Sequence, residues 1–243
     1  MVIIVSAYFK IKSKQSHTFY VNHLKRFLGN IQQMLVFFTT PDLKEFILSL
    51  RGNLPITLIE VESVYSIAAF QKFPLEFWKK QCQIDPEKYH TPELAAIWFN
   101  KKEFVMEACN IIKRDVPYIW CDAGSIRHDS WIPIIHTFGN NTQLIPTNKL
   151  LLQLLITPDK KKLYFKHPDI HIAGAIIAGY KDTWVLTSGL YDAMVMEYSN
   201  LNIPVNMDQY IWMSAVQKNP EHFEVIVPII QYIDAWFFFY DYL

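Results

Sequence analysis

Apolar runs alternate with helix-like segments along the first half of the chain. Four short runs rich in β-branched and aromatic residues have the length of buried strands: residues 2–8, 34–38, 56–61 and 117–121. Between these runs, apolar residues recur at intervals of three and four positions, which is typical of helices that pack on one face. Strands that alternate with helices in this way predict an α/β fold with a parallel sheet.

Two helix starts can be placed from the residues themselves. Thr40 is followed by Pro41, and Thr91 is followed by Pro92 and Glu93. Threonine is a good N-cap and proline fits the first helical position, so we expect a helix to begin after each threonine. The first should end near residue 50, and the second should be the longer of the two.

The second half of the chain is less regular. Residues 170–178 predict a strand, and residues 183–198 and 207–217 predict helices. The aromatic run at residues 236–240 is interpreted as a terminal strand or a docking segment. The chain has no internal repeat, low-complexity stretch or linker, so we expect residues 1–243 to form a single domain.

Composition narrows the class of protein. Hydrophobic residues make up 51% of the 243 positions, which is enough for one well-filled core. The 23 basic and 23 acidic residues cancel, which argues against nucleic acid as a partner, because nucleic-acid-binding surfaces are usually strongly basic. The 3 widely spaced cysteines fit reduced thiols and a cytoplasmic location. No run reaches the roughly 18 apolar residues of a membrane span, and no secretory leader is expected.

Candidate binding residues follow two of the predicted strands, because ligands of open α/β sheets bind beyond the carboxyl ends of strands. Ser6, Ala7 and Tyr8 close the first strand, and Asp122, Ala123 and Gly124 follow the fourth. A carboxylate followed by two small residues lets a metal-bound diphosphate approach the backbone, and Mg²⁺ and Mn²⁺ prefer oxygen ligands. Arg127 could bind phosphate through paired hydrogen bonds. Alternatively, Asp122 caps a helix or pairs with Arg127 in a turn.

Several other chemistries find no support in the residues. Ser6 is not part of a Gly-x-Ser-x-Gly turn, and the chain has no glycine-rich phosphate loop. Cys121 should point to the face opposite Asp122, so we do not expect it to act as a nucleophile. Lys101 and its neighbour Lys102 are interpreted from sequence alone as solvated charges.

The segment from Tyr118 to Arg127, which contains Trp-Cys-Asp-Ala-Gly, resembles the signature of the HtrL/YibB family. The similarity continues in residues 20–51, in residues 92–105 with Trp98 and Lys101, in residues 171–179, and in Trp184 and residues 207–209. That family is in turn similar to the A-type glycosyltransferases, which take sugars from nucleotide diphosphates.

The resemblance implies a nucleotide-diphospho-sugar transferase fold of the A-type glycosyltransferase kind. This is an α/β fold with a mostly parallel central sheet flanked by helices and a mixed C-terminal half. The nucleotide-binding half would be about residues 1–127, and the acceptor-side half about residues 128–243. The substrates would be a UDP- or GDP-linked sugar and a hydroxyl of a glycan or glycoconjugate. Mn²⁺ or Mg²⁺ would be the cofactor.

The same resemblance implies roles for individual residues. Asp208 and Gln209 look like the Asp-Gln pair of retaining transferases such as the glycogenin-like family, and would be catalytic. Asp122 would also hold the metal. The donor would be bound by Ser6, Ala7, Tyr8, Lys101, Asp122, Ala123, Gly124 and Arg127, and the acceptor side would include Gly174 and Trp184. Alternatively, Asp208 is only the N-cap of the helix that begins near Gln209.

The chain departs from the A-type pattern at the metal site. Gly124 stands where the second aspartate of the Asp-x-Asp motif is expected, so one metal ligand is missing. A late histidine completes the metal site in many such enzymes, and His222 is the candidate after Asp208. The alternative function is therefore a catalytically silent nucleotide- or carbohydrate-binding protein with the same fold.

Overall fold

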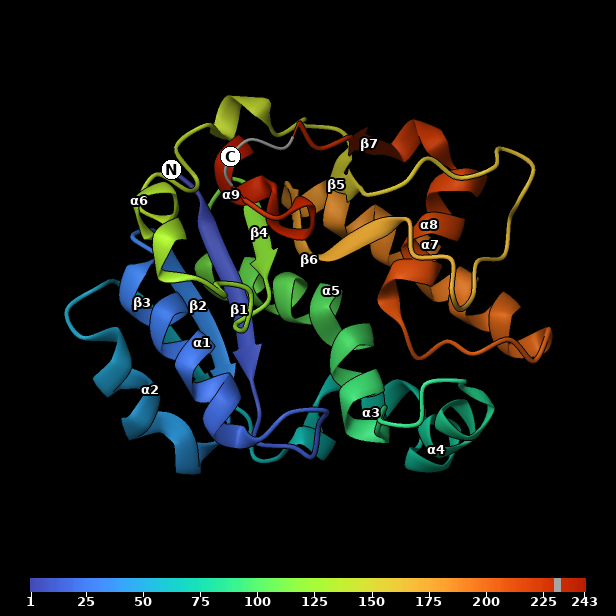
Figure 1. Ribbon diagram of the computed structural model, residues 1–243, viewed down its shortest axis with the longest axis horizontal. Helices are drawn as coiled ribbons and strands as arrows, with labels where there is room; N and C mark the ends of the chain where they lie inside the picture. Colours follow the sequence, from blue (N-terminus) through green and yellow to red (C-terminus); the bar gives the residue numbers. More distant parts are fainter. Residues whose placement is uncertain (230–232) are drawn as a thin grey trace.

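The computed structural model describes residues 1–229 and 233–243 (Figure 1). Seven strands form one sheet in the order β3-β2-β1-β4-β6-β5-β7. The strands are β1 Ile3–Tyr8, β2 Met34–Thr39, β3 Ile56–Glu60, β4 Tyr118–Cys121, β5 Leu150–Leu154, β6 Ile172–Gly179 and β7 Phe223–Ile226. β1 pairs in parallel with β2 and β4, β2 with β3, and β5 with β7, whereas β6 runs antiparallel to β4 and β5.

Helices lie on both faces of this sheet (Figure 1). The helices are α1 His17–Asn30, α2 Lys44–Arg51, α3 Ala68–Lys72, α4 Leu75–Ile84, α5 Pro92–Ile112, α6 Ile132–Ile135, α7 Lys181–Asn200, α8 Asp208–Lys218 and α9 Phe239–Tyr242. The predicted fold class is confirmed: the fold is α/β, with a mostly parallel sheet flanked by helices and a mixed C-terminal half.

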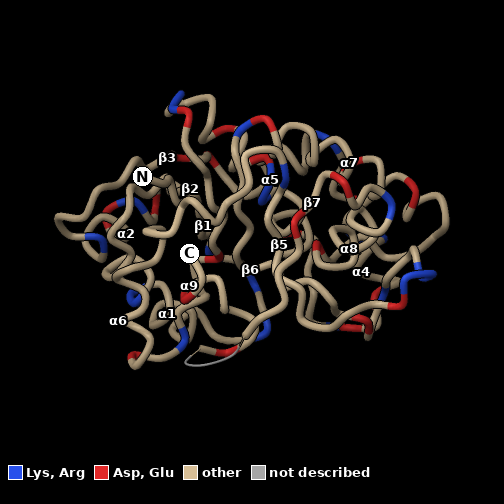
Figure 2. The backbone as a smooth tube through the Cα atoms, turned by 90° about the horizontal axis from the view of Figure 1, so that it is seen from above, with Lys and Arg blue, Asp and Glu red and all other residues tan. Residues whose placement is uncertain are grey.

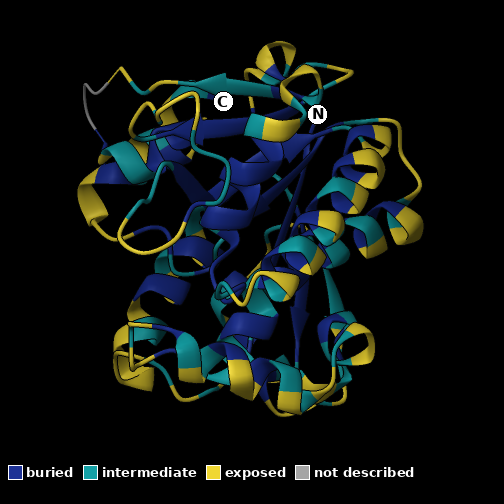
Figure 3. Cartoon of the chain, turned by 90° about the vertical axis from the view of Figure 1, so that its right-hand side faces the viewer, coloured by how far each residue is buried: buried dark blue, intermediate teal, exposed yellow. Residues whose placement is uncertain are grey.

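Strand alternation divides the core into two layers. Ile3 and Val5 of β1 pack on the side covered by α3, α4, α5, α7 and α8, while Ile4 packs on the side covered by α1, α2, α6 and α9. β1, β2, β4, β5 and β6 are buried along most or all of their length, the edge strands β3 and β7 are mostly half-buried, and the helices expose their outer stripes (Figure 3). A sheet buried on both faces explains why β1, β2 and β4 are continuous apolar runs in the sequence.

A helical segment begins after each of the two predicted threonines, with proline in its first turn, but only Thr91 caps its helix through the side chain. The Thr91 hydroxyl accepts a hydrogen bond of 3.3 Å from the Leu94 N–H at the start of α5. The Thr40 side chain makes no capping hydrogen bond. A 3₁₀ turn, Pro41–Leu43, lies between Thr40 and α2, so the threonine is not at the N-terminus of the α-helix.

The C-terminal aromatic run is not a strand, and it packs against the chain's own core, which agrees with the docking interpretation. It forms a 3₁₀ turn, Ala235–Phe237, followed by α9. Phe237, Phe239 and Tyr240 are buried in the core layer beneath α1 and α6. Burial of these rings against the chain's own sheet accounts for an apolar run that otherwise looks like an exposed patch.

Charged residues of both signs are mixed along the chain (Figure 2). The 23 basic and 23 acidic residues therefore do not separate into long segments that carry charge of a single sign. Within residues 1–229 and 233–243, the structure contains no helix with the length and hydropathy of a membrane span.

Candidate functional site

The Lys101 ammonium joins two carboxylates that come from distant parts of the chain. Its Nζ lies 3.1 Å from Asp122 Oδ1 and 2.9 Å from Asp208 Oδ2. It also donates a hydrogen bond of 2.9 Å to the carbonyl oxygen of Gly174. The lysine side chain is only 4% exposed, so α5 delivers a buried charge to this point. The interpretation of Lys101 as a solvated charge is wrong, because the residue points from α5 toward the sheet.

The neighbouring lysine points elsewhere and is buried as well. Lys102 Nζ lies 2.7 Å from Asp192 Oδ1 of α7 and also pairs with Glu103. It stands 4.2 Å from the centre of the Phe99 ring, an arrangement that favours a cation. Burial lowers the pKa of Lys102, and its two acidic partners oppose that effect. Lys102 therefore ties α5 to α7 and does not contribute to the Lys101 cluster.

Asp122 is placed by the end of β4, as the sequence predicts. Its backbone N–H donates a hydrogen bond of 2.8 Å to Ala175 of β6, which continues the sheet one residue past β4. The indole N–H of Trp120 donates a hydrogen bond of 2.7 Å to Asp122 Oδ1 and fixes the carboxylate. The Asp122 side chain remains 35% exposed, so it is the carboxylate of the pair that a ligand can reach.

Asp208 is the first residue of α8, and its carboxylate is almost fully buried. The N-cap position is Met207, so the alternative interpretation of Asp208 as a helix cap is wrong. Gly174 makes room for the carboxylate, since a Cβ at that position would lie 2.6 Å from Asp208 Oδ2. Asp208 is thus turned inward, toward β6 and Lys101.

The charges in this cluster do not cancel. Burial alone would lower the pKa of Lys101, but the negative charges of Asp122 and Asp208 outweigh burial, and the pKa is raised. Burial raises the pKa of Asp208, which Lys101 lowers and Asp122 raises further. When all three groups are ionised, two carboxylates face one ammonium and the cluster carries a net negative charge. Loss of the lysine would leave a buried carboxylate without its counter-charge, at a cost of roughly 3–5 kcal/mol.

A cavity of ≈ 490 Å³ opens above this cluster. The predicted site residues that line it are Ala7, Tyr8, Lys101, Asp122, Ala123, Gly124, Arg127, Gly174, Asp208 and Gln209. They come from the end of β1, from α5, from the turn after β4, and from the starts of β6 and α8. The antiparallel direction of β6 matters here, because it brings the start of that strand to the same edge as the ends of β1 and β4.

Two predicted residues do not line the cavity. Ser6 is completely buried within β1. Trp184 is completely buried in α7, and its indole N–H donates a hydrogen bond of 3.2 Å to the carbonyl oxygen of Tyr118. Their side chains therefore occupy packing positions, and the expected contacts of Ser6 with the donor and of Trp184 with the acceptor side lack a place in this structure.

Arg127 is exposed at the cavity and does not pair with Asp129. Its guanidinium stacks over the ring of Phe237, 4.7 Å from the ring centre. Asp129 is held instead by Arg26, with 2.6 Å between Nε and Oδ1. The Asp122 carboxylate pairs with Lys101, so the alternative interpretation in which Asp122 pairs with Arg127 in a turn is wrong. A planar, stacked guanidinium is well placed to bind an anion.

Neither Cys121 nor His222 lines the cavity. Cys121 is buried on the far side of β4, with its Sγ 3.0 Å from the Tyr240 hydroxyl, and burial raises its pKa to about 12. It faces away from the cavity, as predicted. His222 is not among the residues that line the cavity and lies 3.4 Å from Glu221. Among residues 1–229 and 233–243, no group of three or more His, Cys, Asp or Glu side chains is arranged to bind a metal ion.

Some cavity residues were not predicted from the sequence. His17 of α1 lies with its Nδ1 2.7 Å from the hydroxyl of Tyr8, and burial is the main cause that raises the pKa of Tyr8 to about 12. Lys14, Glu87, His90 and Trp236 also line the cavity. Most of them come from the polar loops 9–16 and 85–91, which carry no periodic signal. The loop 9–16 follows a predicted strand end, which could have singled out Lys14, whereas the loop 85–91 lies between α4 and α5 and carries no such signal.

Comparisons with known proteins leave the family open. No family model matches the chain, and neither does any of the curated proteins. Among solved structures, the chain is similar to CMP:2-keto-3-deoxy-manno-octonic acid synthetase complexed with CTP, with a TM-score of 0.48 and 11% sequence identity. The match covers 93% of this chain and 89% of the other. The expected membership of the HtrL/YibB family is not shown by these comparisons.

Proposed function

We propose that this protein is a glycosyltransferase that moves a sugar from a nucleotide diphosphate to a hydroxyl of a glycan or glycoconjugate. The observation that supports this most is the Lys101 ammonium between Asp122 and Asp208 at the base of the cavity. It joins the predicted donor carboxylate to the predicted catalytic carboxylate, although the sequence places them on different elements. We further propose that the chain is a single-domain relative of the HtrL/YibB family.

The two sides of the cavity differ in a way that suits such a reaction. Arg127, Lys14 and His17 line the side formed by β1, α1 and the turn after β4. These groups suit the diphosphate of a UDP- or GDP-linked donor, whose base would stack on Tyr8 or Trp236. Asp208 and Gln209 lie on the opposite side, at the start of α8.

In this proposal, Asp208 stabilises the positive charge that develops at the anomeric carbon as the diphosphate leaves. Lys101 and Gly174 hold the carboxylate in place, so little reorganisation is needed when the charge forms. Lys101 also places a positive charge near the leaving diphosphate. Gln209 lines the cavity beside Asp208 and would hydrogen-bond a sugar hydroxyl.

Mn²⁺ or Mg²⁺ fits this site only together with a diphosphate. Asp122 is 35% exposed and faces the cavity, but its two oxygens already lie 3.1 Å and 3.3 Å from Lys101 Nζ. Asp208 is 4% exposed and is held by the same lysine. One accessible carboxylate leaves most ligand positions to phosphate and water, which is how Mg²⁺ is commonly held beside nucleotides. We propose that Asp122 holds the metal, which would polarise the diphosphate, in the presence of the donor.

A thermal-shift screen of UDP, GDP and their sugar conjugates, with and without Mn²⁺, tests this function. Binding at a hundredfold excess over Kd stabilises the folded state by about 2.7 kcal/mol. We expect Mn²⁺ alone to shift the melting temperature little, and Mn²⁺ with nucleotide to shift it more than nucleotide alone. Asp122→Asn should remove the metal-dependent part. A protein that none of these compounds stabilises would not have the proposed donor site.

The silent-binder alternative is favoured by a specific observation. Gly124 supplies no second carboxylate, and no cluster of three metal-ligating side chains occurs among the residues that the structure describes. Release of nucleoside diphosphate from a bound donor, measured with and without added glycans, separates the two functions. Turnover supports the transferase, whereas tight binding without turnover supports the silent binder. We place either activity in the cytoplasm, since Cys82, Cys109 and Cys121 are free thiols.

A further inference from the structure

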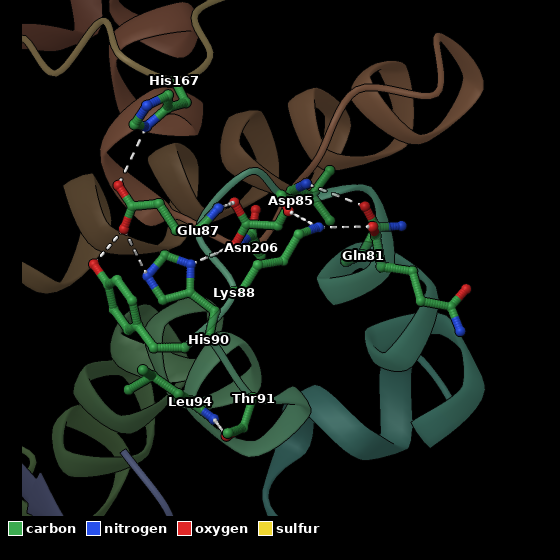
Figure 4. Close-up of polar contacts among 12 residues, drawn as sticks. Gln81, Asp85, Glu87, Lys88, His90, Thr91, Leu94, His167 and Asn206 are labelled. Carbon is green, nitrogen blue, oxygen red and sulfur yellow. Dashed lines mark hydrogen bonds and ion pairs between the residues drawn. The ribbon is translucent and has the colours of Figure 1, made fainter. Parts of the chain in front are cut away.

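A second polar cluster lies on the wall of the same cavity, in the loop between α4 and α5. Its centre is His90, whose side chain is 1% exposed (Figure 4). His90 Nδ1 contacts Asp85 Oδ2, and His90 Nε2 lies 3.2 Å from Glu87 Oε2. Glu87 Oε1 in turn lies 3.2 Å from Nδ1 of His167. Four titratable side chains therefore form one connected row.

His90 lies between two carboxylates. Its Nδ1 contacts Asp85 and lies 3.1 Å from Asn206 Nδ2, whereas its Nε2 lies 3.2 Å from Glu87 Oε2 without forming a hydrogen bond. Asp85 is itself fixed, because Oδ1 accepts a hydrogen bond of 2.9 Å from the Glu87 N–H and Oδ2 accepts one from Asn206 Nδ2. Glu87 is held as well, because its Oε2 accepts a hydrogen bond from the Tyr89 hydroxyl and its Oε1 faces His167.

Glu87 is also accessible where a substrate would lie. Its side chain is 20% exposed and lines the cavity, whereas the Asp85 side chain is 4% exposed. On the other side of Glu87, His167 is 42% exposed. The row therefore leads from the cavity through Glu87 to a solvent-exposed histidine, and this is a path by which a proton taken from a substrate can leave.

The same short segment, residues 206–208, contacts both the His90 cluster and the Lys101 cluster. The segment 206–208 contributes Asn206 to Asp85 and Asp208 to Lys101. On α5, the residues that line the cavity run from Leu94 to Lys101, about 10 Å at 1.5 Å per residue. His90 and Glu87 lie just before the first of these residues, and the Lys101 cluster lies at the last. A sugar bound along this strip has a carboxylate at each end.

We propose that Glu87 is the general base that takes the proton from the acceptor hydroxyl, and that His90, held by Asp85, is a positioning residue for Glu87. In this step the hydroxyl proton passes to a Glu87 oxygen and the hydroxyl oxygen forms a bond to the anomeric carbon. The bond from that carbon to the diphosphate breaks, and its electron pair stays on the diphosphate oxygen. His167 then carries the proton to solvent. The inference rests on the proposed transferase function.

The test uses the intact protein and a donor found by thermal shift, with water as the acceptor hydroxyl. Nucleoside diphosphate release is measured for the parent, for Glu87→Gln and for Glu93→Gln. Glu93 lies in the first turn of α5, and its Oε1 accepts a hydrogen bond from the Tyr65 hydroxyl. It does not line the cavity, so it is a matched control. Glu87→Gln should lower kcat on the order of 10²-fold or more. Its nucleotide-induced melting shift should equal that of the parent, and the control should keep parental turnover.

His90→Asn tests the positioning role. The asparagine amide can still reach Asp85 from the place of Nδ1, but the variant removes the Nε2 contact with Glu87, while the contacts of Glu87 with Tyr89 and His167 remain. We expect a lower kcat with little change in KM, and the double variant Glu87→Gln/His90→Asn should lose no more than Glu87→Gln alone. Additive losses, or a fall in melting temperature that accounts for the lost activity, would show that His90 is only structural.

The outcomes separate this inference from the function on which it rests. Parental turnover in Glu87→Gln would remove Glu87 as the base and leave the transferase function intact. Loss of the nucleotide-induced shift in Glu87→Gln would assign the residue to donor binding or folding, which also overturns the inference. A parent that binds nucleotides and turns over no donor would overturn the transfer reaction, and the base with it.

Discussion

Gly174 lies directly against the carboxylate of Asp208, and a Cβ at position 174 would come within 2.6 Å of Oδ2. Two further contacts, both 3.1 Å, would be made with the other carboxylate atoms. The carboxylate cannot move away freely, because it is buried and held by Lys101. A single hydrogen in place of a methyl group at position 174 thus leaves room for the Asp208 carboxylate.

We predict that Gly174→Ala destabilises the protein by roughly 1–3 kcal/mol, the usual range for overpacking a buried site. Gly189→Ala is the control, since its Cβ would meet nothing within 4 Å on the exposed side of α7. It should stabilise by about 0.4–1 kcal/mol, because alanine favours a helix more than glycine does. Urea unfolding of the three proteins measures both changes. Equal stability of the two variants would contradict the close packing of Gly174 on Asp208.

We predict that removing the positive charge of Lys101 lowers the free energy of unfolding substantially. Lys101→Met should cost about 3–5 kcal/mol of unfolding free energy, because it leaves Asp208 buried without its counter-charge. The double variant Lys101→Met/Asp208→Asn should recover part of that loss. Lys149→Met is the control: its pair with Glu224 is 34% and 43% exposed, so we expect a change of about 0–1 kcal/mol. A double variant less stable than Lys101→Met would show that the carboxylate is not the source of the cost.

Asp208 also predicts a pH dependence of stability. Its pKa in the folded state is raised above the ordinary 3.8, chiefly by burial. As pH rises above 3.8, the unfolded chain releases this proton before the folded chain does, and Asp208 then costs stability until the folded carboxyl is also ionised. Relative to Asp208→Asn, the parent should therefore lose stability between pH 4 and neutral pH. Unfolding free energies of the two proteins across that interval provide the measurement, and a relative gain by the parent would contradict the raised pKa.

We predict that replacing Arg127 by lysine affects nucleotide binding more than the same replacement of Arg26 does. Arg127→Lys should weaken UDP or GDP binding, because a point charge does not replace the planar fork that binds phosphate through paired hydrogen bonds. Arg26→Lys is the matched control, since Arg26 pairs with Asp129 and does not line the cavity. Nucleotide titrations followed by melting temperature compare the two. If both variants bind like the parent, Arg127 does not contact the phosphates.

The parallel part of the sheet could be predicted from the sequence, and the rest could not. β1, β2, β3 and β4 are short apolar runs that end at polar loops; β1, β2 and β4 are largely buried, and β3 is half-buried at the sheet edge. β5 is a leucine run without β-branched residues, and β7 is half-buried, so neither has a strand pattern. β5 is placed by its pairing with β6, and β7 by its pairing with β5, and in both cases the partner strand lies far along the chain.

The site could be predicted in part for a similar reason. Asp122 is a local feature of a strand end, and the sequence locates it without knowledge of the rest of the fold. Lys101 and Lys102 are adjacent, and only the direction in which α5 faces the sheet separates the cavity residue from the structural one. Glu87 and His90 lie in a polar loop, and their meaning depends on Asn206 and His167 from far along the chain.

The reversed direction of β6 has a consequence for how such a protein can diversify. The connection from β5 to β6 emerges beside the cavity and is closed at its neck by a hydrogen bond of 2.7 Å from the Leu155 N–H to the His171 carbonyl oxygen. It carries Ile170 to the cavity and His167 to Glu87. Because the neck is fixed by the sheet, insertions and deletions within residues 156–170 leave the strand register unchanged. Change in this one loop can alter which acceptors enter while the residues proposed to bind the donor stay as they are.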